Sequence, residues 1–312
     1  MRLTLAFIFV LTAALTQPAL AQDWETLACP VEDHISGLTF VQADTAFAVT
    51  KSGRCLRTYD GGISWSIFSV SGGLSLEDAC FLDGKRGAVC GRNGQIHLTV
   101  DGGVTWEDNS WPDTAAWFFD IEFFDDKTAM VVGIRRLPDA PLTGIALRST
   151  DSGRTWKEYQ TIGMGYSEID YRTGGPVYLL SIGKIHTSTD GGEKFKSRLA
   201  GLNRPARTIS MFGATGIMAG PNGVCAYTRD SGVTWNQTAL EQELVVVASQ
   251  MVDEKTGYIA GKDGLMMVTT DGGKNWQKEE IDPTMHVLDL CLGGDNLYAV
   301  GGNGKIIFKK VR

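Results

Sequence analysis

Regularly spaced aspartates are the residues of this chain whose type and position most suggest chemistry. Six of them stand in one short phrase, which runs from Ser or Thr through Asp and Gly to an aromatic residue: Asp60, Asp101, Asp151, Asp190, Asp230 and Asp271. Paired carboxyl groups can act as general acid and base. Each aspartate, however, belongs to a different copy of one hairpin turn, so the six cannot share a substrate. In such a turn Asp accepts backbone N–H bonds and Gly takes φ > 0, which predicts a structural role.

Other patterns for catalysis or metal binding are missing from the sequence. It contains no Gly-x-Ser-x-Gly, no P-loop and no Cys-x-x-Cys. The four histidines, His34, His97, His186 and His286, are scattered without ligand spacing. We therefore expect no catalytic residue, no metal and no cofactor.

The turn phrase defines a repeat. It returns at intervals of 41, 50, 39, 40 and 41 residues, which indicates a repeated supersecondary unit. A second turn signal, a glycine before an apolar strand, occurs seven times, at Gly53, Gly94, Gly144, Gly183, Gly223, Gly264 and Gly304. Each unit reads as four short strands, in the second unit at 76–82, 86–90, 95–99 and 105–108. Four antiparallel strands repeated radially predict an all-β fold, a seven-bladed β-propeller.

The last unit lacks an outer strand of its own. After Gly304 the chain has one more strand and then ends, without an Asp turn. Asp23-Trp24-Glu25-Thr26 repeats the register of Thr105-Trp106-Glu107, which follows a turn phrase. We expect this N-terminal strand to complete the last blade and close the ring.

The first residues have the pattern of a secretion signal. Arg2 precedes an apolar run over 3–15, and Ala19-Leu-Ala21 is a small-x-small cleavage site. We expect residues 1–21 to be a Sec signal peptide cut near Ala21, and residues 22–312 to be one periplasmic or secreted propeller domain. The apolar run is short for a bilayer span, and no later stretch approaches one. A formal net charge of −7 argues against a nucleic-acid partner.

Six cysteines in an exported chain allow disulfide bridges. Cys80 and Cys90 flank one predicted hairpin and would face each other if its loop is 84–86. Cys29 follows the closing strand and Cys55 lies just past a turn, so this pair could staple the ring, worth roughly 3–4 kcal/mol in the chain-entropy model. Free thiols throughout are the open alternative.

The turn phrase resembles the Asp-box, or bacterial neuraminidase repeat. Sialidases with this repeat have six blades, an arginine triad and an Arg-Ile-Pro motif before the first box, whereas the nearest match here, Arg136-Leu-Pro138, follows the second box. The chain is more similar to the photosystem II stability/assembly-factor family, single seven-bladed Asp-box propellers, over essentially all of 23–312. Repeats such as 94–106 and 264–276 carry this resemblance. It implies a non-enzymatic factor that holds membrane-protein precursors; a sialidase- or glycosidase-like enzyme or a carbohydrate-binding propeller is the alternative.

A partner would bind the face that carries the connectors between blades and the turns between second and third strands. The 50-residue interval contains an insertion, 135–142, in one of these turns, and long loops on a rigid scaffold tend to carry function. Exposed Arg and Trp are typical interface anchors. The candidates on this face are Arg92, Trp111, Trp117, Arg135, Arg136, Arg204 and Arg207. We expect a monomer that binds a periplasmic segment of a membrane protein or complex. A small-ligand site in the channel is the rival interpretation. A third interpretation gives these residues a structural role only, with the aromatic side chains filling the mouth of the channel.

Overall fold

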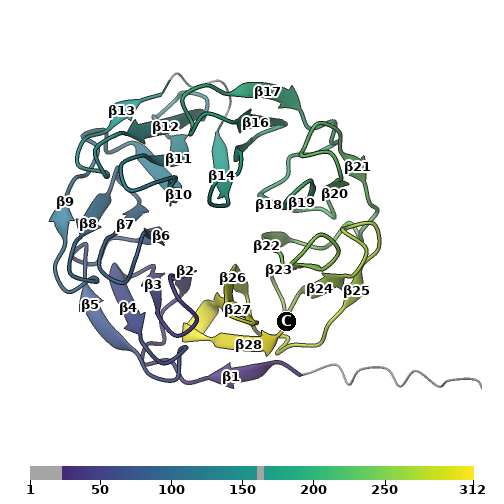
Figure 1. Ribbon diagram of the computed structural model, residues 1–312, viewed down its shortest axis with the longest axis horizontal. Helices are drawn as coiled ribbons and strands as arrows, with labels where there is room; N and C mark the ends of the chain where they lie inside the picture. Colours follow the sequence, from purple (N-terminus) through teal and green to yellow (C-terminus); the bar gives the residue numbers. More distant parts are fainter. Residues whose placement is uncertain (1–22, 160–164) are drawn as a thin grey trace, which may run out of the picture.

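The computed structural model describes residues 23–159 and 165–312, which form a ring of antiparallel β-sheets (Figure 1). Seven four-stranded sheets, here called blades 1 to 7, follow one another around the ring. The prediction of a seven-bladed β-propeller is therefore confirmed. The predicted signal peptide and its cleavage site lie outside the described residues.

In blades 1 to 6 the four strands follow chain order, with the first strand innermost and the fourth at the rim (Figure 1). Blade 1 contains β2 (Ile35–Phe40), β3 (Ala46–Thr50), β4 (Arg54–Thr58) and β5 (Ser66–Ser69); blade 2 contains β6 (Leu76–Phe81), β7 (Gly87–Gly91), β8 (Ile96–Thr99) and β9 (Glu107–Asp108). Blade 3 contains β10 (Ala116–Phe123), β11 (Ala129–Arg135), β12 (Thr143–Ser149) and β13 (Lys157–Glu158); blade 4 contains β14 (Tyr166–Tyr171), β15 (Val177–Ser181), β16 (Lys184–Ser188) and β17 (Lys196–Leu199). Blade 5 contains β18 (Thr208–Phe212), β19 (Thr215–Ala219), β20 (Cys225–Thr228) and β21 (Asn236–Gln237); blade 6 contains β22 (Val246–Met251), β23 (Gly257–Gly261), β24 (Met266–Thr269) and β25 (Gln277–Lys278).

Blade 7 is assembled from both ends of the chain. It contains β26 (Val287–Gly293), β27 (Asn296–Gly301), the 3₁₀ turn η1 (Gly302–Gly304) and β28 (Ile306–Lys310), and β1 (Glu25–Leu27) adds its outer strand. Glu25 lies opposite Phe308 and Leu27 opposite Ile306 in an antiparallel ladder. The preceding Trp24 donates its indole N–H to Glu279 at 2.8 Å, which ties the closing strand to blade 6. The predicted closure by the N-terminal strand is confirmed.

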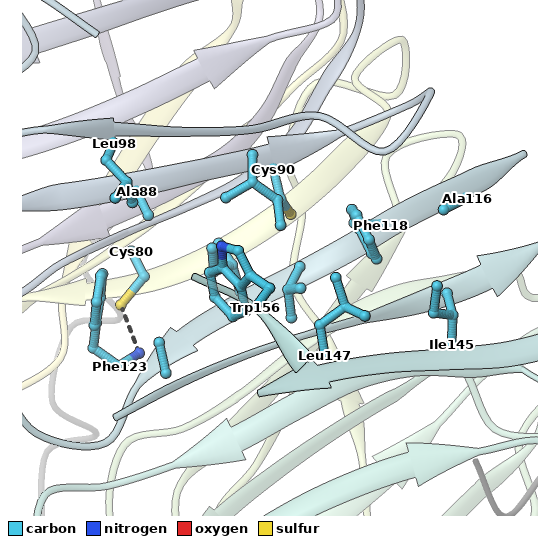
Figure 2. Close-up of a cluster of buried hydrophobic side chains, with 14 residues drawn as sticks. Cys80, Ala88, Cys90, Leu98, Ala116, Phe118, Phe123, Ile145, Leu147 and Trp156 are labelled. Carbon is cyan, nitrogen blue, oxygen red and sulfur yellow. Dashed lines mark hydrogen bonds between the residues drawn. The ribbon is translucent and has the colours of Figure 1, made fainter. Parts of the chain in front are cut away.

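The hydrophobic core is a set of layers between neighbouring blades, since each sheet is covered on both faces. The residue two positions after each glycine signal is buried in all seven blades: Cys55, Ile96, Ala146, Ile185, Cys225, Met266 and Ile306. Figure 2 shows the layer between blades 2 and 3, where Leu98 and Ala88 lie over Phe123, Cys90 lies beside Phe118, and Trp156 packs in the middle of the cluster. Burying apolar area between blades is the main stabilisation of such a ring.

Both candidate disulfides are wrong: all six cysteines lie in the described part of the chain and are free. Cys80 lies opposite Ala88, while Cys90 lies opposite Asp78, so the two thiols are offset along the ladder. The Cys80 sulfur instead accepts the N–H of Phe123 at 3.5 Å (Figure 2).

The second pair is separated by a whole blade. Cys29 packs in the layer between blades 7 and 1, whereas Cys55 packs between blades 1 and 2. Because successive strand residues point to opposite faces, Cys55 cannot turn toward Cys29 without a register shift.

The two faces of the ring differ in the turns they carry. On the top face, the turns between second and third strands bond to the connectors between blades, as Gly94 accepts from Trp111 at 2.8 Å. On the bottom face, each Asp-box turn lies beside the first turn of its own blade, as Gly102 donates to Lys85 at 2.8 Å. Among the described residues, no helix has the length and hydropathy to cross a membrane.

Candidate functional site

The six Asp-box aspartates act within their own turns. In blade 2, Asp101 accepts the backbone N–H and hydroxyl of Thr105 at 2.9 and 2.6 Å and the hydroxyl of Thr99 at 2.9 Å. The Trp106 indole closes the turn on the carbonyl of Gly103, whose φ is +80°. The hydrogen bonds from Thr105 lower the pKa of Asp101 to about 2. A carboxylate with so low a pKa is a weak base, and its hydrogen bonds commit it to its own turn.

The described residues lack the groupings expected of a metalloenzyme or a sialidase. No three His, Cys, Asp or Glu side chains of residues 23–159 and 165–312 are grouped to hold a metal ion. In that same part of the chain, the upper cavity of the central channel has one arginine, Arg207, and the lower cavity has one, Arg172. An arginine triad converging in one central pocket is thus not formed there.

Blade 3 and its neighbour bring the first candidate residues together on the top face. The Arg92 guanidinium stacks over the Trp117 ring, 3.9 Å from its centroid, and the two backbones form an isolated β-bridge. Trp117 meets Phe119 edge-on at 4.8 Å between centroids. The Arg92 side chain is 54% exposed and is 3.8 Å from Glu77, so its charge remains accessible. A cation over an indole, open to solvent on its outer side, is a typical anchor for a partner.

Arg135, which the sequence suggested as a partner-binding residue, is already paired with two acids of the chain. Its Nε donates to Asp113 at 2.5 Å, and its Nη2 lies 3.2 Å from Glu158. The hydrogen bonds to Glu158, followed by that to Asp113, raise the pKa of Arg135 above its usual value. The two acids hold the guanidinium against blade 3, so Arg135 supports the loop rather than presenting a free charge.

The insertion after Arg135 is the exposed part of this region. Residues 136–142 join β11 to β12 on the top face, and Arg136 is exposed. Leu137 and Leu142 are 48% and 44% exposed. Trp111 lies in the neighbouring connector but packs partly into the layer between blades 2 and 3. The surface formed by Arg92, Trp117, Arg136, Leu137 and Leu142 is called the blade-3 patch below.

The last two candidates lie elsewhere. Arg204 lines a rim cavity between the connector after blade 4 and the top of blade 5. Arg207 lines the upper channel cavity together with Lys51, Glu77 and Phe119. Phe119 lines this cavity and also contacts Trp117, so Arg207 lies across the channel mouth from the blade-3 patch. Arg204 lies in a different cavity, away from this patch.

The structure also shows polar residues that the sequence interpretation missed. Asp78, Asp120, Glu168 and Asp289 line the channel from the innermost strands. A signal was present, because each is an acid inside a predicted first strand, as in Val287-Leu-Asp-Leu. We return to this group below.

Comparisons with known proteins agree with the repeat. The family model described as photosynthesis system II assembly factor YCF48 matches residues 210–286. The photosystem II assembly lipoprotein Ycf48 of Synechococcus sp. (strain CC9902) is 24% identical over 162 residues. That match covers 47% of this chain and 44% of the relative, so it spans less than half of the relative's length.

Among solved structures, YCF48 bound to D1 peptide superposes with a TM-score of 0.75 at 18% identity, over 95% of this chain and 99% of that one. YCF48 from Cyanidioschyzon merolae gives a TM-score of 0.74 at 16% identity, over 92% and 98%. The WD40 propeller domain of Doa1 gives 0.72 at 11% identity, over 92% and 97%. A likeness that extends to WD40 propellers shows the fold alone. In sequence, over 210–286, and in fold, over nearly its whole length, the chain is similar to the YCF48 photosystem II assembly factors, which confirms the resemblance carried by its repeats.

Proposed function

We propose that this chain is an exported, non-catalytic scaffold that binds another protein and serves as an assembly or stability factor for a membrane or envelope complex. The observation that carries the proposal is the blade-3 patch, where Arg92 stacks on Trp117 and the exposed loop of residues 136–142 begins beside them, since Trp117 lies opposite Ile134 and Arg136 donates to the carbonyl of Ala115 at 3.0 Å. The likeness to an assembly factor solved with a bound peptide supports a protein partner. The partner is a segment of a membrane protein, held by the top face of a monomeric propeller.

The mechanism is that of a rigid platform. The ring presents its top loops on strands packed on both faces, so the patch is held in place before the partner arrives and little conformational entropy is lost there. Arg92 and Arg136 attract acidic or carbonyl-rich segments, and Trp117, Leu137 and Leu142 provide apolar contact. No bond is made or broken.

An affinity capture from envelope extract tests the proposal. Arg92→Glu/Arg136→Glu reverses two charges of the patch, and Arg135 is left alone because its loss would unsettle the loop. Arg154→Glu is the matched control, since Arg154 is exposed in the Asp-box turn of blade 3 on the opposite face. We expect the partner yield of the double variant to be at least about tenfold lower than that of the wild type, which corresponds to the loss of about 1.4 kcal/mol of binding free energy. Arg154→Glu should retain the wild-type yield. Equal yields from wild type and the double variant would exclude this patch.

A small-ligand site is the second candidate, because the channel holds a polar lower cavity of about 420 Å³. That volume falls in the range of small-molecule pockets. The upper cavity, about 140 Å³, has room for only a few water molecules. A sugar or other polar metabolite that raises the melting temperature in a concentration-dependent manner would favour this candidate over the scaffold.

A further inference from the structure

One position per blade faces the waist of the channel. In every blade but the fifth it follows a β-bulge of the innermost strand, and in blades 2, 3, 4 and 7 it carries an acid: Asp78 opposite Cys90, Asp120 opposite Val132, Glu168 opposite Leu180 and Asp289 opposite Val300. The equivalent residues of blades 1, 5 and 6 are Gly37, Thr208 and Ala248. All four acids line both the upper and the lower cavity, so they form the waist between them. The four acids are called the waist carboxyls here.

Each waist carboxyl bonds to the next blade. Asp289 accepts the N–H of Leu38 at 2.8 Å, and Asp78 accepts that of Ile121 at 3.1 Å. Asp120 and Glu168 accept the N–H groups of Ile169 at 2.7 Å and Ile209 at 2.9 Å, respectively. The carboxyls therefore join blade 7 to blade 1 and link blades 2 to 5 in series.

The remaining blades use uncharged groups at the same level. The hydroxyls of Thr208 in blade 5 and Ser249 in blade 6 are 2.7 Å apart. Two residues further along, the hydroxyl of Ser210 accepts the N–H of Met251 at 2.9 Å. In blade 1, a Cβ on Gly37 would come within 2.8 Å of the Asp78 carboxyl oxygen. Gly37 thus leaves the space that the neighbouring acid occupies.

Protons are needed to hold these acids so close together. Asp78 and Asp120 lie on adjacent blades and line the same two cavities with Glu168 and Asp289, so their ionised forms would repel one another. Burial in the channel wall raises the pKa of Asp289 to about 7 and lifts those of Asp120 and Glu168 well above the usual range. Burial raises the pKa of Asp78 as well.

The surrounding charges do not neutralise the waist. Of the two further acids in the lower cavity, burial raises the pKa of Glu122 to about 8 and that of Asp170 to about 7. Lys51 is paired with Glu77 above the waist. Below it, Arg172 donates to the carbonyls of Met211 and Met251 at 2.5 and 2.8 Å, and the only other cation lining either cavity among the described residues is Arg207 at the top.

Uncharged polar groups and thiols complete the surroundings. The innermost strands of blades 1 and 6, β2 and β22, contribute no acid or base to the waist. The thiols of Cys80 and Cys291 lie nearby, and burial raises the pKa of both, so they remain neutral.

We propose that Asp78, Asp120, Glu168 and Asp289 form a proton-operated latch: with protons bound they hold neighbouring blades together around the channel, and when the protons leave, mutual repulsion loosens blades 2 to 5 and the joint between blades 7 and 1. The latch is independent of what the top face binds.

The sign of the effect follows from linkage. The folded state holds protons that the unfolded chain, with acid pKa values near 4, has already lost, so the stabilisation is complete below about pH 4 and declines as the pH rises through about 7 to 8. His97 and His186 act in the opposite direction, since burial lowers the pKa of both and the unfolded chain protonates them below about pH 6.5. Between pH 6.5 and 8.0 the remaining histidine contribution raises the stability as the pH rises, so a fall in stability across this window comes from the carboxyls.

Thermal unfolding of the purified protein between pH 6.5 and 8.0 tests the latch. We expect the wild-type Tm to fall by about 5 °C across this window. Asp120→Asn/Glu168→Gln keeps an acceptor oxygen at both positions but removes the titration, and should lose at least about half of that fall. The control Asp126→Asn/Glu254→Gln removes two exposed acids and should follow the wild type. A double variant with the wild-type pH profile would overturn the proposal.

A second measurement needs no variant. Unfolding the wild type in urea at pH 7.0 in weak buffer should release protons, because the folded state binds more of them; no release, or net uptake, would overturn the latch. Hydrogen exchange adds the structural readout. Protection of the amides of Ile121, Ile169 and Ile209, corrected for intrinsic rates, should drop severalfold from pH 6.5 to 8.0 relative to Met251, which bonds to the uncharged Ser210. Equal changes at all four amides would contradict a latch located at the carboxyls.

Discussion

At the scale of single residues, two environments shift the pKa values of carboxyl groups in opposite directions. The Asp-box aspartates accept several hydrogen bonds at the surface, which lower the pKa of Asp60, Asp101 and Asp230 to about 2. The waist carboxyls are enclosed by the channel wall, and burial raises their pKa values. One side-chain type thus stabilises turns as an anion on the bottom face and links blades as an acid in the channel.

The Asp-box turns predict acid sensitivity. Because the folded pKa of Asp101 lies below the unfolded value, its contribution is present above about pH 4 and is lost as the pH falls toward 2. Asp101→Ala should lower the free energy of unfolding by about 1 kcal/mol at pH 7, through lost hydrogen bonds, and by less at pH 2.5. Urea unfolding at both pH values measures this, with Asp126→Ala as the exposed control. An equal loss at both pH values would show that the charge of Asp101 is irrelevant to the turn.

At the scale of elements, the ring depends on a closing strand of three residues. β1 has little ladder of its own, so the contacts of Trp24 with Glu279 and, edge-on, with Tyr258 contribute much of its attachment. Without β1, one face of the layer between blades 6 and 7 would meet water, because Trp24 packs on that layer. Closure of a propeller by pairing its two ends removes the exposed edge that would otherwise invite aggregation.

Trp24→Ala should therefore destabilise the whole ring, by about 2 kcal/mol for a half-buried indole. Glu25→Ala, at the next position but exposed, is the matched control and should change the free energy of unfolding by less than about 0.5 kcal/mol. Chemical denaturation followed by far-ultraviolet circular dichroism, rather than by tryptophan fluorescence, measures the free energy of unfolding of both variants. If the two variants are equally stable, closure does not depend on the indole.

Features of the fold that depend on local sequence could be predicted, and those that depend on side-chain facing could not. Seven blades and their closure followed from turn chemistry, because Gly with φ > 0 and an Asp that accepts N–H bonds are local requirements repeated at fixed spacing. The pairing of Arg135 was not predictable, since its partners Asp113 and Glu158 come from a connector and from the rim strand of the blade. The waist carboxyls escaped notice because a bulge between Leu76 and Asp78 shifts the alternation of inward and outward residues by one. The two disulfide predictions failed for different reasons. Cys80 and Cys90 share the layer between blades 2 and 3 but are offset along the ladder, whereas Cys29 and Cys55 lie in different layers.

At the scale of the whole molecule, the propeller separates its functions by position. Asp-box turns stabilise the bottom face, the waist carboxyls join blades around the channel, and the insertion of residues 136–142 lies on the top face near Arg92 and Trp117. Long loops on a rigid scaffold tend to carry function, and the proposed partner site includes this loop. The central claim is therefore that a protein partner contacts the blade-3 patch.

Site-specific photo-crosslinking in the intact envelope tests that claim most directly. A photoreactive amino acid in place of Leu137 probes the patch, and one in place of Val233 probes the Asp-box face; the two native side chains are similarly exposed, at 48% and 51%. The account predicts a discrete protein adduct from position 137 that is reduced by Arg92→Glu, and none of that mass from position 233. Adducts of equal mass and yield from both positions, or from neither, would contradict it.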